Sequence, residues 1–187
     1  MKEKILKGKR VFLRQPTDKD FGELVLLYKS SRKFHRGLVQ TPITKKAFEK
    51  YLAHSRQETN KYFLICRNKD GAIVGSVNLS QIFQGNFKNA YLGYYLGEKF
   101  TRQGIMTEAA EILLRFAFKG LKLHRVEANV QPENLPSIKV LQRNGFTKEG
   151  FSRRYLKIGG RWRDHERWAI IIEDWKKHHN TKDERSS

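Results

Sequence analysis

Hydrophobic residues recur along the chain with two spacings, one typical of strands and the other of helices. Alternating or continuous apolar positions predict seven strands, over residues 11–14, 62–67, 72–82, 90–97, 124–130, 151–158 and 162–172. Apolar positions three or four apart predict helices through residues 21–27, from about residue 44, over 104–119 and over 134–144. The turn-forming pairs Asp70–Gly71, Gly85–Asn86 and Gly159–Gly160 are expected to join neighbouring strands as hairpins.

The order of these elements predicts an α+β fold. Strands joined by tight turns are antiparallel, whereas strands 90–97 and 124–130 are joined through a helix and must run parallel if they pair. We therefore expect a mixed, mostly antiparallel sheet that carries one central parallel pair and is flanked by helices. A single domain is expected over residues 1–175, and the polar segment 176–187 is expected to be a frayed tail.

The charge of the chain is strongly positive. Its 38 Lys and Arg residues exceed its 19 Asp and Glu residues, which gives a net charge of +19. Such a field attracts polyanions and disfavours free polyamine substrates, so it indicates either a polyanionic environment such as ribosomal RNA or simply a basic surface.

Other features of composition narrow the setting. The chain has no apolar run of about 18 residues, so no membrane partner is expected, and no signal-peptide pattern follows the basic start. A cytoplasmic location is therefore expected. The lone Cys66 lies in an apolar run and is interpreted as a buried hydrophobe, and no metal site is expected because no paired Cys and His spacing occurs.

One candidate site lies where strand 90–97 leads through a glycine loop into helix 104–119. The first N–H groups of a helix lack internal partners and carry partial positive charge, so they suit a pyrophosphate. Gly104 allows phosphates to approach the backbone closely, and Arg102 adds a flexible cation. An ordinary helix start capped by Thr101 explains the same residues.

A second candidate segment is NLPSIKVLQRNGF, from Asn134 to Phe146. The Asn134 side chain is expected to cap this helix by accepting from the Ser137 amide. Beside a cofactor cleft, the Asn134 amide also suits a pantetheine arm, and the Ser137 hydroxyl suits donation to a leaving thiolate. The capping role alone requires no function.

Taken together, the two segments resemble the GNAT superfamily of N-acetyltransferases. The stretches GYYLGEKFTRQGIMTEA, HRVEANVQPENLPS and YLKIGGRWRDH resemble its ribosomal-protein-alanine N-acetyltransferase branch, the RimJ/RimL-like enzymes, over roughly residues 71–175. The resemblance implies that acetyl-CoA lies between the splayed parallel strands, with its thioester near Tyr95 and Leu96. It also implies contacts to the pantetheine arm from Asn134 and Ser137, and to the pyrophosphate from the loop residues Arg102, Gln103, Gly104, Ile105, Met106 and Thr107.

The chain departs from the superfamily pattern at the positions that carry acid and base. Leu141 stands where many members have a tyrosine acid, so Ser137 or a water is the expected acid. Arg154 stands where some relatives have an acidic residue, which leaves the base unassigned. Glu149 and Glu98 are the base candidates, and each also fits a solvated or ion-paired carboxylate.

A weakly equipped site favours an acceptor that is easily deprotonated. An α-amine has an ordinary pKa of about 7.7–8.0, against about 10.4 for lysine, so roughly a quarter or more of it is neutral near pH 7.5. The expected function is therefore acetyl transfer from acetyl-CoA to a protein N-terminal amine, the alanine of a ribosomal protein. The alternatives are a small-molecule amine as acceptor and a non-catalytic module that binds RNA or the ribosome.

Overall fold

The computed structural model describes residues 5–184, and side chains as far as residue 179. Its centre is one eight-stranded sheet with the order β1-β2-β3-β4-β5-β6-β8-β7. Every neighbouring pair is antiparallel except β5 and β6, which are parallel. The strands are β1 Leu6–Lys7, β2 Val11–Arg14, β3 Lys61–Arg67, β4 Ile73–Phe83, β5 Asn89–Leu96, β6 Arg125–Val130, β7 Thr147–Ile158 and β8 Arg161–Ile171.

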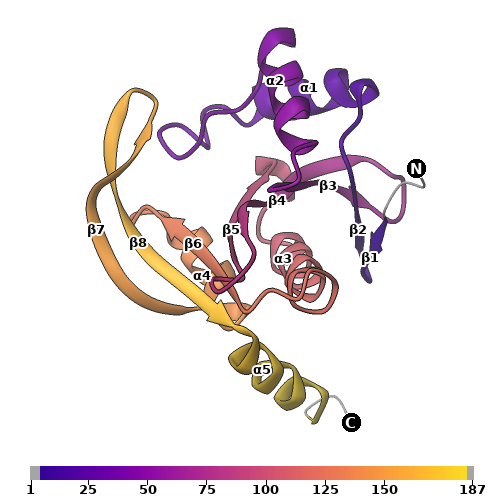
Figure 1. Ribbon diagram of the computed structural model, residues 1–187. Coiled ribbons are helices and arrows are strands. Elements are labelled where there is room, and N and C mark those ends of the chain that lie inside the picture. The colour runs from indigo at the N-terminus through magenta and orange to yellow at the C-terminus, as the bar shows by residue number, and fades with distance from the viewer. Residues whose placement is uncertain (1–4, 185–187) are drawn as a thin grey trace.

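Helices cover both faces of the sheet. Helices α1 and α2 lie over one face, and α3 lies against the other with α4 beside it (Figure 1). The apolar residues of α3, from Ile105 to Leu114, are buried against the sheet and form the largest helical part of the core. The helices are α1 Phe21–Ser30, α2 Lys45–Ser55, α3 Ile105–Arg115, α4 Leu135–Arg143 and α5 Ile172–Glu184, with a π-helical turn at Phe116–Gly120.

The architecture confirms the predicted mixed sheet with one parallel pair flanked by helices. Strand β7 begins at Thr147, four residues before the predicted start. The sequence did not indicate this earlier start, because residues 147–149 are exposed and polar and show no apolar alternation. The short strand β1 was not predicted.

The expectation of a frayed tail is wrong for residues 176–184, which continue helix α5. Trp175 anchors this helix because its side chain is buried, with its ring centroid 5.4 Å from that of Phe118. Residues 185–187 lie outside the described part of the chain, and the extent of a single domain stays a prediction.

Strands β5 and β6 separate soon after they meet. They pair only between residues 89–91 and 125–127, whereas Leu92–Leu96 of β5 has no partner on the β6 side among the paired residues of the described sheet. The structure therefore opens a wedge in the middle of the sheet, at the end of β5 that leads towards α3.

Candidate active site

The open edge of β5 offers backbone groups to a ligand. The Gly97 N–H donates to the Val74 carbonyl at 2.9 Å, so odd-numbered residues at this end of β5 direct their polar backbone groups towards β4. The N–H and C=O groups of Tyr94 and Leu96 consequently point towards β6, across the wedge. An amide-bearing chain of pantetheine type fits such an edge as an additional strand would.

The loop between β5 and α3 forms a concave backbone surface. Both Arg102 and Gly104 have positive φ angles, of 60° and 72°, and Gly104 is the residue directly before α3. Successive amides in such a conformation form a nest that suits an anion, and the first amides of α3 add to it. The side chains of Ile105 and Met106 are buried, so these two predicted cofactor residues have only their backbone N–H groups to offer.

An ion pair between the exposed Arg10 and the less exposed Glu108 holds this loop from behind. Arg10 donates from Nη1 to the Gln103 carbonyl at 2.6 Å and from Nη2 to the Gly104 carbonyl at 3.3 Å. Its Nε donates to Glu108 of α3 at 2.7 Å. Burial opposes ionisation of Glu108, but hydrogen bonds from the backbone and side chain of Arg10 and from the Val11 amide lower its pKa overall. Because Arg10 uses the loop's carbonyl groups, the amides remain on the opposite side.

Ser137 and Asn134 lie together at the start of α4. The Asn134 side chain accepts from the Ser137 amide at 3.3 Å, which confirms the predicted cap. This contact uses the carbonyl end of Asn134, so its amide end is the part suited to a pantetheine arm. Leu141 is fully buried, and α4 therefore places no phenol at the position where many superfamily members carry one.

A phenol reaches Ser137 from β5 instead. The Tyr94 hydroxyl lies 2.6 Å from the Ser137 Oγ and also donates to the Ser137 carbonyl at 3.2 Å. Burial raises the pKa of Tyr94 to about 12, against the opposing effect of the Ser137 hydrogen bond, so the phenol stays protonated at neutral pH. Sequence reasoning missed Tyr94, although the adjacent tyrosines of GYYL were a signal that one must face each side of the sheet.

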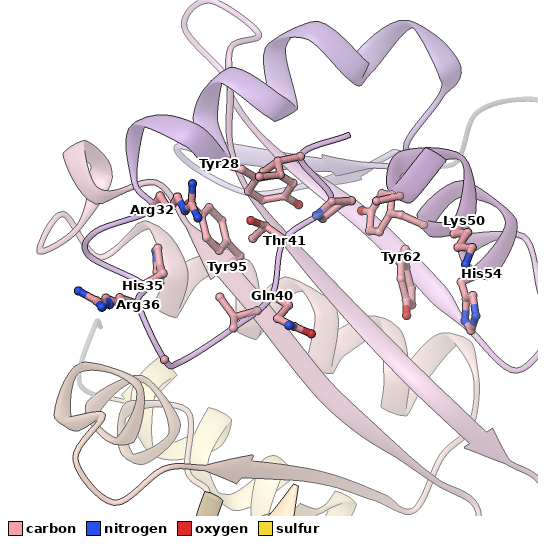
Figure 2. Close-up of a pocket in the computed structure, with 16 residues that line it drawn as sticks. Tyr28, Arg32, His35, Arg36, Gln40, Thr41, Lys50, His54, Tyr62 and Tyr95 are labelled. Atoms are coloured by element: carbon pink, nitrogen blue, oxygen red, sulfur yellow. The ribbon is translucent and has the colours of Figure 1, made fainter. Parts of the chain in front are cut away.

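The predicted residue Tyr95 faces the opposite side of the sheet from Tyr94. Its ring packs edge-on against Tyr28 of α1 at 4.7 Å and lies 4.2 Å from the ring of His35. It forms part of the wall of a cavity of about 1050 Å³ that extends between the α1–α2 segment and the sheet (Figure 2). The cavity thus lies over the face of β5 that carries Tyr95, whereas the wedge lies along the edge of β5 towards β6.

Neither carboxylate proposed as a base reaches this cavity. Both oxygens of Glu149 accept from Arg125, whose hydrogen bonds lower the pKa of that carboxyl, and this weakens Glu149 as a proton acceptor. Glu98 is exposed just after β5 and is not among the residues that line the cavity. Asp164 accepts from the Arg154 amide at 2.7 Å, so it is engaged within the β7–β8 hairpin.

Within residues 5–184, no group of three or more His, Cys, Asp or Glu side chains is arranged to hold a metal ion. No helix in the same part of the chain is both long and apolar enough to cross a bilayer. Cys66 is buried in β3, and burial raises the pKa of its thiol to about 11.

A fold with a wedge of this kind between its parallel strands is typical of an acyltransferase. Comparison with known proteins supports this class. The acetyltransferase (GNAT) domain model matches residues 10–147. The chain therefore belongs to the GNAT acetyltransferase family.

Its relatives include a probable N-acetyltransferase and an enzyme with an assigned acceptor. A probable N-acetyltransferase of Bacillus subtilis, YjcK, is 35% identical over 178 residues, which cover 91% of this chain and 98% of that protein. The [ribosomal protein uS5]-alanine N-acetyltransferase of Escherichia coli is 38% identical over 120 residues, 64% of this chain and 62% of that enzyme. Mycobacterium smegmatis RimJ, solved in complex with CoA-disulfide, superposes with a TM-score of 0.81 at 28% identity, over 91% of this chain and 86% of that one.

Proposed function

We propose that this acetyltransferase transfers the acetyl group of acetyl-CoA to the α-amine of a protein N-terminus, and that its substrate is a ribosomal protein with N-terminal alanine. The observation that carries the proposal is the arrangement around β5. The unpaired backbone edge of β5 and the α3 amides suit the cofactor, and a cavity large enough for the end of a peptide lies over the face of β5 that carries Tyr95.

Acetyl-CoA supplies an acetyl group activated as a thioester. The polar backbone groups of Tyr94 and Leu96 would hold its amide-bearing arm, with the Asn134 amide as a further partner. The amides from Gly104 to Thr107 and the exposed Arg102 would hold its phosphates, as the residues present fit an anion of that kind.

The departure of the thiolate requires a proton, and Ser137 is the group that we propose to supply it. Its hydroxyl is buried and lies within hydrogen-bond distance of the Tyr94 hydroxyl. A proton given up by Ser137 can be replaced from the phenol when the phenol turns its hydrogen from the Ser137 carbonyl to Oγ. A relay of this kind takes the place of the tyrosine acid that many superfamily members carry at the position of Leu141.

The α-amine is favoured as the acceptor over a lysine side chain. Near pH 7.5, deprotonation costs an α-amine under about 1 kcal/mol and a lysine about 4 kcal/mol. The cavity presents no carboxylate that would draw in a lysine ammonium. The name of the Escherichia coli relative, which acts on the alanine of uS5, supports a protein N-terminus as the acceptor.

The proposal is tested by incubating the protein with acetyl-CoA and a purified set of ribosomal proteins, followed by mass spectrometry of intact proteins and of their N-terminal peptides. We expect one added acetyl group on an N-terminal alanine, and slower acetylation at low acetyl-CoA concentration with a Gly104→Glu variant. Acetylation confined to small-molecule amines in a parallel panel would reject the protein acceptor. Salt-dependent RNA binding without a calorimetric signal for acetyl-CoA would reject catalysis altogether.

A further inference from the structure

The charged side chains that line the cavity beside Tyr95 are all positive. Arg32 and Arg36 line it near Tyr95, and Lys50 lines it near His54 at the other end (Figure 2). None of these three side chains makes a hydrogen bond or ion pair with a described residue, and no Asp or Glu lines the cavity. Unpaired cations around a cleft with low-dielectric walls focus a positive potential inside it.

A positive potential has two effects on an amine that enters. It disfavours the ammonium form and so lowers the pKa of the amine, which increases the neutral fraction that can attack a thioester. It also attracts any negative charge that the same molecule carries close to the amine. A purely cationic acceptor is repelled, whereas an acceptor with nearby carboxylates is held.

We propose that this cavity is the acceptor site and that it selects N-terminal segments with acidic residues within a few positions of the amine. This inference rests on the proposed function and adds the class of peptide that the site takes. The occupant is a peptide rather than a free amine because the cavity extends from Tyr95 past Tyr62 to His54, far beyond the space that one amine fills.

Three peptides of equal length test the selection. Each begins with Ala-Ala and continues with three Glu, three Gln or three Lys residues before a common neutral end. We expect both kcat/KM and equilibrium binding to fall in the order Glu, Gln, Lys, by about tenfold at each step in low salt, and the differences to shrink in high salt.

An Arg36→Glu, Lys50→Glu double variant should lose the preference for the Glu peptide while its affinity for coenzyme A stays within about twofold. Lys69→Glu, in the β3–β4 turn, reverses one charge at a position away from the cavity. This variant should keep the Glu, Gln, Lys order of peptide preference. Binding that ignores peptide charge, or that favours the Lys peptide, overturns the inference. Binding in the expected order without acetylation of any peptide would refute only the proposed function.

A separate observation concerns His35, which lies at the Tyr95 end of the cavity. Its Nε2 is 2.8 Å from the Leu96 carbonyl, the same carbonyl that points across the wedge. A carbonyl only accepts, so Nε2 carries the hydrogen and the neutral ring keeps its lone pair on Nδ1. The ring packs on Tyr95 at 4.2 Å and against Phe34 at 4.9 Å, which holds it in place.

The surroundings of His35 keep it neutral. Burial lowers its pKa below the ordinary value, against the opposing effects of the Leu96 carbonyl and of the Glu98 carboxylate. The Tyr95 phenol faces it from β5, and Arg32 and Arg36 belong to its own segment of the wall.

We infer that His35 is the proton acceptor for the attacking amine. As the amine nitrogen forms its bond to the acetyl carbon and the bond from that carbon to sulfur breaks, one amine proton passes to Nδ1, directly or through one water. The thiolate takes its proton from Ser137 on the opposite side of β5. The imidazolium then gives its proton to solvent, and the Tyr94–Ser137 pair takes one proton from solvent as the products leave, so that both groups are reset.

The pH dependence of acetylation tests this role. With the Gln peptide, the wild type should show two ionisations on the acid side, that of the amine and that of His35 below its ordinary pKa. In His35→Gln the amide can still donate to the Leu96 carbonyl but cannot take up a proton. We expect kcat to fall about a hundredfold near pH 7.5 and only the amine ionisation to remain.

His54→Gln is the matched control, because His54 lines the far end of the same cavity. It should keep both ionisations, and both variants should bind coenzyme A as the wild type does. If His35→Gln lowers the rate by one factor at every pH, His35 only positions Leu96 and the inference is wrong. A wild type that acetylates nothing would overturn the proposed function and this role together.

Discussion

Replacement of Gly104 tests how closely the phosphates of coenzyme A approach the backbone surface before α3. Its φ of 72° costs a residue with a side chain about 1–2 kcal/mol. A Cβ atom there would lie 3.0 Å from Nη2 and 3.3 Å from Nη1 of Arg10, so the guanidinium must shift. That shift strains its 2.6 Å hydrogen bond to the Gln103 carbonyl. We therefore expect either Gly104→Gln or Gly104→Glu to lower the free energy of unfolding by about 1–2 kcal/mol.

The glutamate adds an electrostatic effect that glutamine lacks. The Cβ at position 104 points towards Arg10, so the carboxylate lies behind the loop, on the far side from the amides. Two unit charges about 8 Å apart in water repel by about 0.5 kcal/mol, so a diphosphate of two charges loses about 1 kcal/mol. This corresponds to about a fivefold higher dissociation constant for coenzyme A in Gly104→Glu than in Gly104→Gln. Because glutamine and glutamate are nearly equal in size, comparison of these two variants isolates the effect of the charge.

The assay is calorimetric titration of coenzyme A into the wild type and both variants, with urea unfolding of each to confirm that all three are folded. Equal affinities of the glutamine and glutamate variants would show that no phosphate lies beside Gly104. Wild-type affinity in both variants would place the cofactor elsewhere on the molecule.

Three further changes probe the surroundings of β5 and α3. Tyr94→Phe should cost about 1–3 kcal/mol in urea unfolding, because it removes the partner of the buried Ser137 hydroxyl, and should lower kcat at least about tenfold with coenzyme A affinity unchanged. Gly75→Ala should cost about 1–3 kcal/mol and lower the melting temperature, because its Cβ would lie 2.3 Å from the backbone oxygen of Tyr95. The pKa of Glu108 is lowered from its ordinary 4.5 in the folded protein, so its contribution to stability is present above pH 4.5 and is lost as pH falls through the lower value. Glu108→Gln should therefore flatten the loss of stability between about pH 5 and pH 3 in urea unfolding, and an unchanged slope would contradict this account.

The sheet was predictable because most of its strands carry a local signal. Alternation of Val126, Ala128 and Val130 marks β6, and the helical spacing of apolar residues from Ala109 to Ala117 marks α3. The connection through α3 then forces β5 and β6 to run parallel. The start of β7 and the whole of α5 lack such a signal, because their residues are largely polar. Among the α5 side chains that the structure describes, as far as residue 179, Trp175 is the one buried deeply in the core.

The parts of the site that depend on residues close together in the sequence were predicted. The parts that depend on residues far apart in the sequence were not. Gly104 precedes its helix directly, and Asn134 caps an amide three residues away. His35 meets the Leu96 carbonyl across 61 positions, and Tyr94 meets Ser137 across 43. Such contacts arise only when the α1–α2 segment and α4 pack on the sheet, so no local pattern encodes them.

The alternation of side chains along β5 explains why the two proposed proton transfers fall to residues on different sides of the sheet. Tyr94 and Tyr95 are consecutive, so one reaches α4 and the other reaches the cavity beside α1. A slip of β5 by one residue against β4 would exchange the two rings and would also turn the Leu96 carbonyl away from the wedge. Gly75 opposes such a slip, because its missing side chain makes room for the backbone at Tyr95 and Leu96. The register of β5 therefore determines the cofactor edge, the thiolate's proton donor and the position of His35 at the same time.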